Sequence, residues 1–149
     1  MIETIDETGR VPKAERELLG RALARLAEEL GAPDAEATVV FLNDDAIADR
    51  NLHDRGVEGT TDVLSYPSWE PEDDAAVPRI PHLGDVLIGA EVAARQAAEH
   101  GHDAATERAV LAAHGLMHLL GHDHPDEDGW APFRTAQRRV VELRTEVAE

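Results

Sequence analysis

The chain is organised around residues 104–124, which read AATERAVLAAHGLMHLLGHDH and hold four of its eight histidines. Alanine and leucine favour helix, Asp103 can cap the helix N-terminus, and Gly121 can take the left-handed conformation that ends a helix. The stretch therefore predicts a helix over Ala104–Leu120 that closes in a sharp turn.

The histidines of this stretch are spaced so that they can meet. Residues four apart lie one turn apart on the same face of a helix, so His114 and His118 can present two imidazoles to one point. Gly121 lets the chain turn back and carry His124 towards the same point. Zn²⁺ binds neutral imidazole, and three protein ligands leave its fourth tetrahedral position open, as in catalytic sites. We therefore predict a zinc site on His114, His118 and His124.

The side chains around these ligands are harder to assign. Asp123 can accept a hydrogen bond from the ring nitrogen of a ligand histidine that does not bind the metal, or it can be a turn residue. His122 is interpreted as a residue that does not bind the metal. The chain has no cysteine, which excludes thiolate metal sites and disulfides. Imidazole-rich coordination also fits zinc better than calcium or magnesium.

The spacing H-x-x-x-H-x-x-G-x-x-H is also that of the metzincin peptidases, whose pattern has a glutamate base after the first histidine and a Met-turn further on. Here Gly115 follows the first histidine, and no methionine lies downstream of Met117. A peptidase with that chemistry would lack its base. A metal that acidifies water and polarises an oxygen could still hydrolyse another substrate, and a phosphodiester suits such a site.

The eleven residues from His114 to His124 resemble the signature of the YbeY family of single-strand-specific metallo-endoribonucleases, H-G-x-L-H-L-x-G-Y-D-H. Met117 replaces a leucine of that signature and His122 replaces the tyrosine, so both departures spare the three predicted ligands.

Two more segments are similar to the same family: Arg55 followed by TDVLSYP at 61–67, and LGDVLI at 83–88. The family usually carries a basic residue and a proline just before the Thr-Asp pair, where this chain has Gly59 and Thr60. The resemblance gives Arg55 a role, because an arginine near the zinc would offer a planar donor fork to phosphate oxygens.

The resemblance implies a zincin-like fold and a zinc-dependent endoribonuclease acting in small-subunit rRNA 3′-end maturation and ribosome quality control. The implied partner is single-stranded ribosomal RNA, within the ribosomal particle or with a protein partner. Two rivals remain: a zinc-dependent peptidase or other hydrolase, and a non-enzymatic ribosome-assembly factor that uses the metal for folding. The general base also stays open between Asp85, Asp123 and a second water.

The formal charge of −17 argues against strong binding of free RNA. Residues 43–67 hold only Arg50 and Arg55 as basic side chains, beside six carboxylates. Net charge governs long-range steering rather than the local field of a cleft, and the zinc would itself add positive charge. Our hypothesis is that productive RNA engagement needs a partner or an assembled particle.

Apolar spacing elsewhere predicts four strands and four more helices. The strands are expected at 2–7 on an edge, 37–42, 62–66 and 83–88. The helices are expected at 12–30, from the cap after 42 to about 51, at 91–101, and at 132–147 with Pro132 in its first turn. Polar loops are expected at 51–59 and 67–82. The fold class is therefore α+β, with a small four-stranded mixed sheet packed with about five helices in one metallohydrolase domain over 1–149.

Three aromatic or imidazole side chains outside the signature invite two readings each. Trp69 can stack on a base or pin its loop to the core, and we favour pinning. His100 and His102 flank the end of the 91–101 helix and could coordinate a metal. The interpretation we favour is that His100 complements the negative helix C-terminus and that His102 precedes the next cap.

The N-terminus is acidic and no apolar run follows it, so no signal peptide is predicted. No stretch approaches the roughly 20 apolar residues of a membrane helix. Together with the lack of cysteine, these features predict a cytoplasmic protein with no membrane partner.

Overall fold

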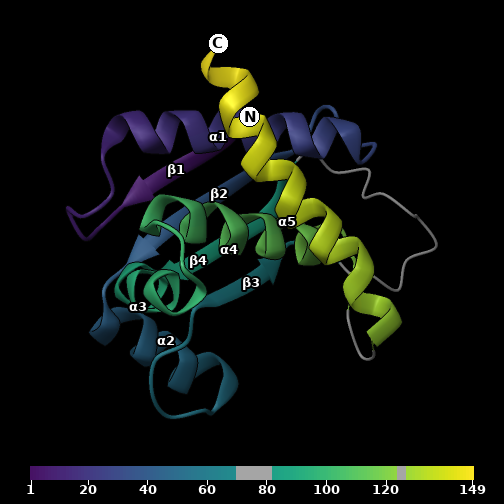
Figure 1. Cartoon of the computed structure of the whole chain (residues 1–149). Coiled ribbons are helices and arrows are strands. Elements are labelled where there is room, and N and C mark those ends of the chain that lie inside the picture. The colour runs from purple at the N-terminus through teal and green to yellow at the C-terminus, as the bar shows by residue number, and fades with distance from the viewer. Residues whose placement is uncertain (70–81, 124–126) are drawn as a thin grey trace.

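The computed structural model describes residues 1–69, 82–123 and 127–149. Within them the order of elements matches the predicted order of strands and helices (Figure 1). The elements are β1 (Ile2–Asp6), α1 (Lys13–Glu29), β2 (Glu36–Leu42), α2 (Asp44–Arg55), β3 (Val63–Pro67), β4 (His82–Gly89), α3 (Ala90–His100), α4 (Ala104–Leu119) and α5 (Glu127–Ala148). The predicted α+β class, with five helices and a four-stranded mixed sheet in the described part, is confirmed.

The sheet has the strand order β1-β2-β4-β3. The pairs β1–β2 and β2–β4 are parallel, while β3 runs antiparallel to β4. The first strand lies on an edge, as predicted. Side chains alternate between the two faces, so Val86 of β4 belongs to the main core and its neighbour Leu87 belongs to a smaller cluster on the other face.

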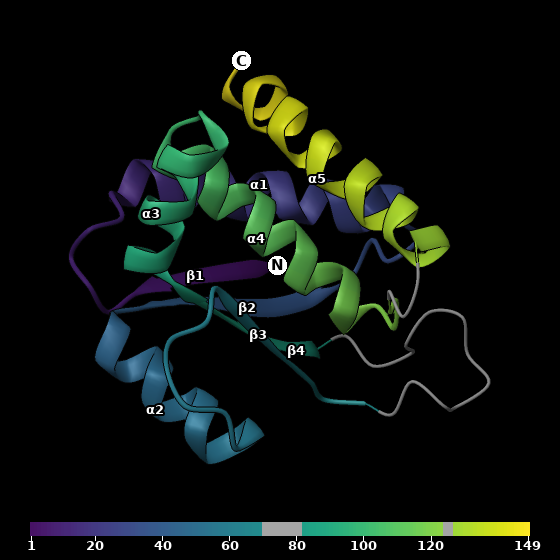
Figure 2. The same cartoon turned by 60° about the horizontal axis from the view of Figure 1, so that its bottom comes forward.

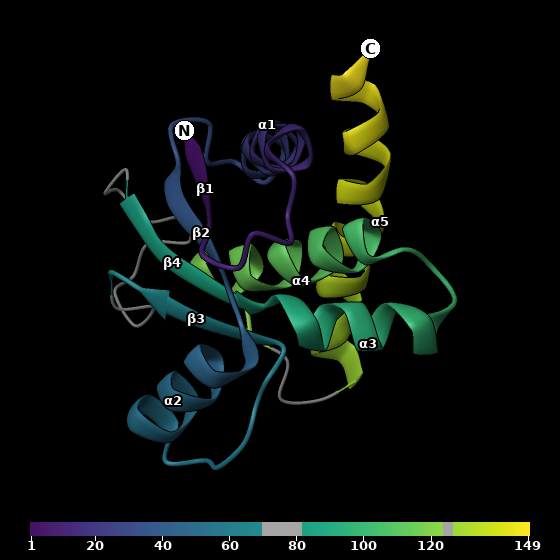
Figure 3. The ribbon, with the colours of Figure 1, turned by 90° about the vertical axis from the view of Figure 1, so that its left-hand side faces the viewer.

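Helices cover both faces of this sheet, with more helices on one face than on the other. Figures 2 and 3 show α1 and α4 on one face with α5 outside them, and α2 on the other face. The smaller core cluster joins α2, through Ile47, to Leu42, Leu64 and Leu87 of the sheet. The large core lies between the sheet and the α1, α4 and α5 layer.

The histidine helix α4 is the central element of the large core. Between positions 107 and 119 every residue is buried except Val110, His114 and His118, which lie four apart on one face. The guanidinium of Arg108 donates two hydrogen bonds of 2.6 Å to the carboxylate of Glu15, which ties α4 to α1. The helix is thus fixed on most sides, and between these positions only the line that carries its histidines is partly exposed.

Two predicted boundaries are wrong. The second helix runs to Arg55 and ends at Gly56 with φ 69°, so Arg55 is its last residue and not part of a loop. Residues 52–55 contain neither glycine nor proline, and the first residue that stops the helix is Gly56. The last helix begins at Glu127, five residues before Pro132, because proline keeps a helical φ and a long helix tolerates the loss of one hydrogen bond. Most of the predicted 67–82 loop, residues 70–81, lies outside the described residues.

Candidate active site

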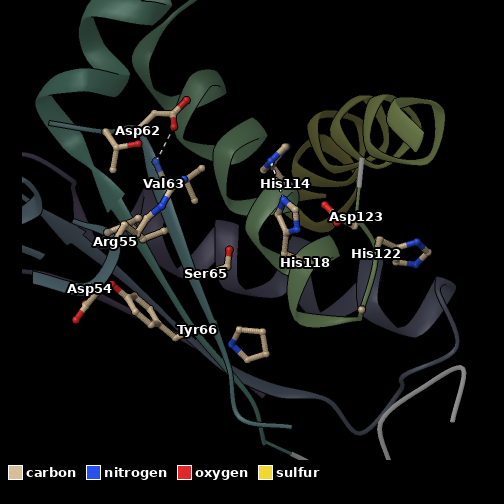
Figure 4. A pocket seen from close by; sticks show the side chains of 14 residues that line it. Asp54, Arg55, Asp62, Val63, Ser65, Tyr66, His114, His118, His122 and Asp123 are labelled. Atoms are coloured by element: carbon tan, nitrogen blue, oxygen red, sulfur yellow. Dashed lines mark hydrogen bonds between the residues drawn. The ribbon is translucent and has the colours of Figure 1, made fainter. Parts of the chain in front are cut away.

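A cleft of about 770 Å³ opens beside the C-terminal half of α4 (Figure 4). Its walls are Asp54 and Arg55 at the end of α2, residues 61–67 leading into β3, the pair His114 and His118, and residues 121–123. These segments are far apart in sequence, and the fold brings them together around one space.

His114 and His118 converge in this cleft. Their Nε2 atoms lie 3.2 Å apart, and both side chains are half-buried. Two nitrogens bonded to one tetrahedral zinc at about 2.0–2.1 Å would lie roughly 3.3 Å apart, so the pair fits such an ion. The third predicted ligand, His124, lies outside the described residues. The structure therefore brings two of the three predicted ligands together, and the complete centre stays a prediction.

Helix α5 holds the two imidazoles in place. The ring of Phe133, which is fully buried, has its centroid 4.8 Å from that of His114 and 5.0 Å from that of His118. The side-chain amide of Gln137 lies 3.3 Å from Nδ1 of His114. When Nε2 of His114 binds a metal, Nδ1 carries the proton, and the amide oxygen of Gln137 can then accept it after a half-turn of the amide.

The chain turns back directly after α4. Gly121 has φ 94°, and the backbone N–H of His122 donates to the carbonyl of Met117 at 3.0 Å. The indole N–H of Trp69 donates to the carbonyl of Leu119 at 2.7 Å, and its ring lies against Gly121. Trp69 is thus pinned to the end of α4, which is the role that we favoured from the sequence.

Arg55 lies across the cleft from the histidine pair, with Ser65 between them (Figure 4). Its side chain is exposed and, within the described residues, makes no hydrogen bond or ion pair. The neighbouring Asp54 is already engaged, because Tyr66 donates to it at 2.6 Å and Arg50 pairs with it at 3.2 Å. Burial, and then the hydrogen bond to Asp54, raise the pKa of Tyr66, so the phenol keeps its proton. Arg55 is therefore placed to receive an anion.

Of the two carboxylates that the sequence left open as a base, Asp123 lines the cleft and Asp85 does not. Asp85 neighbours Val86, which faces α4, so the pleat turns Asp85 to the other face of the sheet, where it pairs with His82 at 3.7 Å. His122 also lines the cleft, although Figure 4 shows its imidazole directed away from His114 and His118.

Sequence reasoning missed Asp62 as a cleft residue, although the Thr-Asp pair of the family motif points to it. One carboxylate oxygen of Asp62 accepts from the backbone N–H of Val63 at 2.8 Å, and the other accepts from Gln96 at 3.3 Å. Among the described residues that line the cleft, it is one of three carboxylates, with Asp54 and Asp123, beside one arginine. The acidic balance of the whole chain thus extends into the cleft.

A second group of metal-binding side chains lies at the other end of α4. His100 Nδ1 and His102 Nε2 approach the same oxygen of Glu107, at 2.8 and 2.6 Å. The hydrogen bond to Glu107 raises the pKa of His100 above its ordinary value. The ligand atoms all lie within 4.8 Å of one another, so this group could hold a metal ion. These contacts come in addition to the positions that we favoured from the sequence, since His100 lies in the last turn of α3 and His102 directly precedes Asp103, the N-cap of α4.

In the described residues, none of the helices has the length and apolar character needed to span a bilayer.

Comparison with known proteins relates nearly the whole chain to one protein family. A family model described as Endoribonuclease YbeY matches residues 1–144. The chain is 44% identical over 143 residues to the Endoribonuclease YbeY of Thermus thermophilus, covering 96% of this chain and 100% of that protein. It is 43% identical over 120 residues to that of Deinococcus radiodurans, covering 80% and 76%. The solution structure of TM1509 from Thermotoga maritima has a similar fold, with a TM-score of 0.69, 23% identity and coverage of 97% and 89%.

Proposed function

Because this chain belongs to the YbeY family of endoribonucleases, we propose that it is a zinc-dependent, single-strand-specific endoribonuclease of small-subunit rRNA 3′-end maturation and ribosome quality control. One observation carries the chemical part of the proposal. His114 and His118 present nitrogens 3.2 Å apart in a cleft whose opposite wall offers the exposed guanidinium of Arg55.

The metal site of the proposal consists of His114, His118 and His124. A zinc ion supplies a Lewis acid, which polarises a phosphoryl oxygen and makes water more acidic at neutral pH. Phe133 fixes the planes of the first two imidazoles, and Gln137 fixes which nitrogen of His114 carries the proton. This support keeps both Nε2 atoms aimed at one point.

The substrate side of the proposal depends on Arg55. Its planar donor fork suits two phosphate oxygens, and charge that develops on a phosphoryl group is stabilised by such a donor. We assign the proton-accepting role to Asp123, which lines the cleft, with a second water as the alternative. A single strand suits the cleft because its backbone can bend a phosphate inwards, which a stacked duplex resists.

The same cleft explains why we expect RNA to be delivered by a partner or a particle. Asp54, Asp62 and Asp123 add negative charge around Arg55, and the chain carries a formal charge of −17. Phosphate contacts normally supply most of the affinity for free nucleic acid. A submicromolar Kd of the isolated protein for generic single-stranded RNA in physiological salt would contradict this expectation.

The peptidase alternative is weakened by the packing of α4. The metzincin base would have to replace Gly115, where even a Cβ would fall 2.4 Å from a buried side chain of the sheet. The assembly-factor alternative uses the metal for folding and has no cleavage step, so it is distinguished by experiment.

The test uses zinc-loaded protein without a histidine tag and a transcript that spans the 3′ end of precursor small-subunit rRNA, both bare and within the particle. We expect cleavage of single-stranded sites at least tenfold faster than of the same sites in a duplex. His118→Ala should abolish cleavage, whereas His53→Ala, an exposed histidine of α2 outside the cleft, should not change it. A metal-loaded wild type that cleaves neither form of the transcript would favour the assembly factor. Cleavage of peptides instead would favour the peptidase.

A further inference from the structure

We propose that His100, His102 and Glu107 form a second metal site, separate from the cleft, which binds Zn²⁺ or a transition-metal ion of similar size. The proposal does not depend on the ribonuclease activity, because it concerns the junction between α3 and α4 and not the cleft that holds His114 and His118.

The three ligand atoms already converge. His100 Nδ1 lies 2.8 Å from Glu107 Oε1, and His102 Nε2 lies 2.6 Å from the same oxygen. Ligands of one zinc ion at about 2.0–2.2 Å lie roughly 3.3 Å apart. To admit an ion, each nitrogen would move about 0.5–0.7 Å away from the shared oxygen, within a group whose ligand atoms all lie within 4.8 Å of one another. His100 has the freedom for this movement, because its side chain is 54% exposed.

The carboxylate is the unusual member of the group. The side chain of Glu107 is only 2% exposed, although burying a carboxylate costs free energy unless it is paired or bound to a metal. Both imidazoles contact the same oxygen of this carboxylate. A divalent ion between these groups would neutralise the buried charge more fully than the hydrogen bonds do.

The surroundings let an ion reach the group. A surface hollow of about 660 Å³ is lined by all three side chains, so an ion can enter from solvent and keep water in its remaining positions. Two imidazoles and one carboxylate form a mixed nitrogen and oxygen set, which suits zinc, cobalt or nickel better than calcium or magnesium.

The site is distinct from the proposed active site. Glu107 and His114 are seven residues apart on α4, which corresponds to about 10 Å along the helix axis. One ion cannot bridge this distance. A smaller hollow of about 480 Å³ is nevertheless lined by Glu107, His100 and His114, so the two sites share a wall. An ion at the second site would join the end of α3 to the first turn of the helix that carries the active-site histidines.

The test counts zinc ions in protein that carries no histidine tag and has been stripped with a chelator. Calorimetric titration with Zn²⁺ should give two sites for the wild type. Glu107→Gln keeps an oxygen that can accept from both imidazoles but removes the anionic ligand, so the second site should weaken at least tenfold and the first should not change. The matched control is Glu99→Gln, which removes the same charge beside His100 and should keep two sites.

A spectroscopic readout locates the second ion. In His118→Ala, which disables the first site, added Zn²⁺ should shift the NMR signals of the His100 and His102 imidazoles. If circular dichroism shows that Glu107→Gln does not fold, His102→Gln replaces it as the test variant, because the glutamine amide can still donate to Glu107. This variant should also lose the second ion. Equal stoichiometry and affinity in wild type and the folded variant would overturn the proposal, as would imidazole signals that do not respond to zinc.

Discussion

Gly115 of α4 lies directly against Val86 of β4: a Cβ built on Gly115 would fall 2.4 Å from Cγ1 of Val86. Val86 is fully buried, and its β-branched side chain has little rotational freedom. Glycine inside a helix normally costs about 1 kcal/mol relative to alanine. The close approach of helix and sheet offsets that cost, and it sets the depth at which the adjacent His114 enters the cleft.

Gly115→Ala should therefore destabilise the protein although alanine is the better helix former. We expect the free energy of unfolding, measured with urea, to fall by about 1–3 kcal/mol, because the new methyl group overpacks the core. We expect a double-mutant cycle with Val86→Ala to recover at least about 1 kcal/mol of the loss caused by Gly115→Ala, since Val86→Ala removes the opposing methyl groups. Strictly additive effects of the two substitutions would show that the contact does not select glycine.

The contact between Trp69 and the end of α4 predicts a structural effect without an RNA effect. Trp69→Phe removes the N–H that donates to the carbonyl of Leu119, so the free energy of unfolding should fall by about 0.5–1.5 kcal/mol. Cleavage of short single-stranded RNA per folded molecule should stay within twofold of wild type. A rise in KM with unchanged stability would instead support the base-stacking role.

Gln137 should control zinc affinity at the His114–His118 site through His114. Gln137→Ala is expected to weaken zinc binding about 10–100-fold, because the ring loses the partner that fixes its proton. Gln137→Glu should retain affinity, since a carboxylate oxygen accepts the same N–H. Competition against a chelator measures the zinc affinity of this site alone when every variant also carries Glu107→Gln, which weakens the proposed second site. Thr135→Ala, on the exposed side of the same helix, is the control. Equal affinity in all variants would remove Gln137 from the site.

The parts of this molecule that could be predicted from sequence are those governed by local spacing. A four-residue step on a helix fixes where two side chains point, so His114 and His118 met as predicted. The support from α5 could not be predicted, because Phe133 and Gln137 reach the imidazoles only through tertiary packing. The last helix was placed too late because Pro132 was given its commonest position.

The same distinction holds for the charged groups. The sequence allowed both Asp85 and Asp123 as a base, and only the pleat of β4 showed that Asp85 faces away from the cleft. His100 and His102 were related to helix ends, which are local features. Their common contact with Glu107 depends on the tight turn between α3 and α4, whose path the spacing alone did not define.

The cap of α4 predicts a pH dependence of stability. Asp103 accepts from the backbone N–H of Thr106 at 2.7 Å, and hydrogen bonds from the Thr106 side chain and backbone lower the pKa of Asp103 below 3.8. A carboxyl group whose pKa is lower in the folded protein stabilises above its unfolded pKa, and this stabilisation is lost as the pH falls through the folded pKa.

Asp103→Ala should thus lower the free energy of unfolding by about 1 kcal/mol at pH 7, and the difference from wild type should shrink below about pH 3.8. Asp103→Asn keeps a capping oxygen, so it should retain most of the stability but lack the decline in acid. Urea titrations at pH 7, 5 and 3 measure all three proteins. A wild-type advantage over Asp103→Ala that is constant with pH would contradict the role of the charged cap.

Arg55 should affect cleavage and nothing else. It is exposed at the end of α2, lines the cleft opposite His114, and makes no ion pair within the described residues. Arg55→Ala is therefore expected to leave zinc content and the free energy of unfolding unchanged while lowering RNA cleavage at least tenfold. Arg55→Lys should recover only part of the rate, since an ammonium lacks the planar fork. Arg25→Ala, an exposed arginine of α1, controls for the loss of one positive charge. If Arg55→Ala and Arg25→Ala cleave equally well, the cleft wall contributes no phosphate contact at this position.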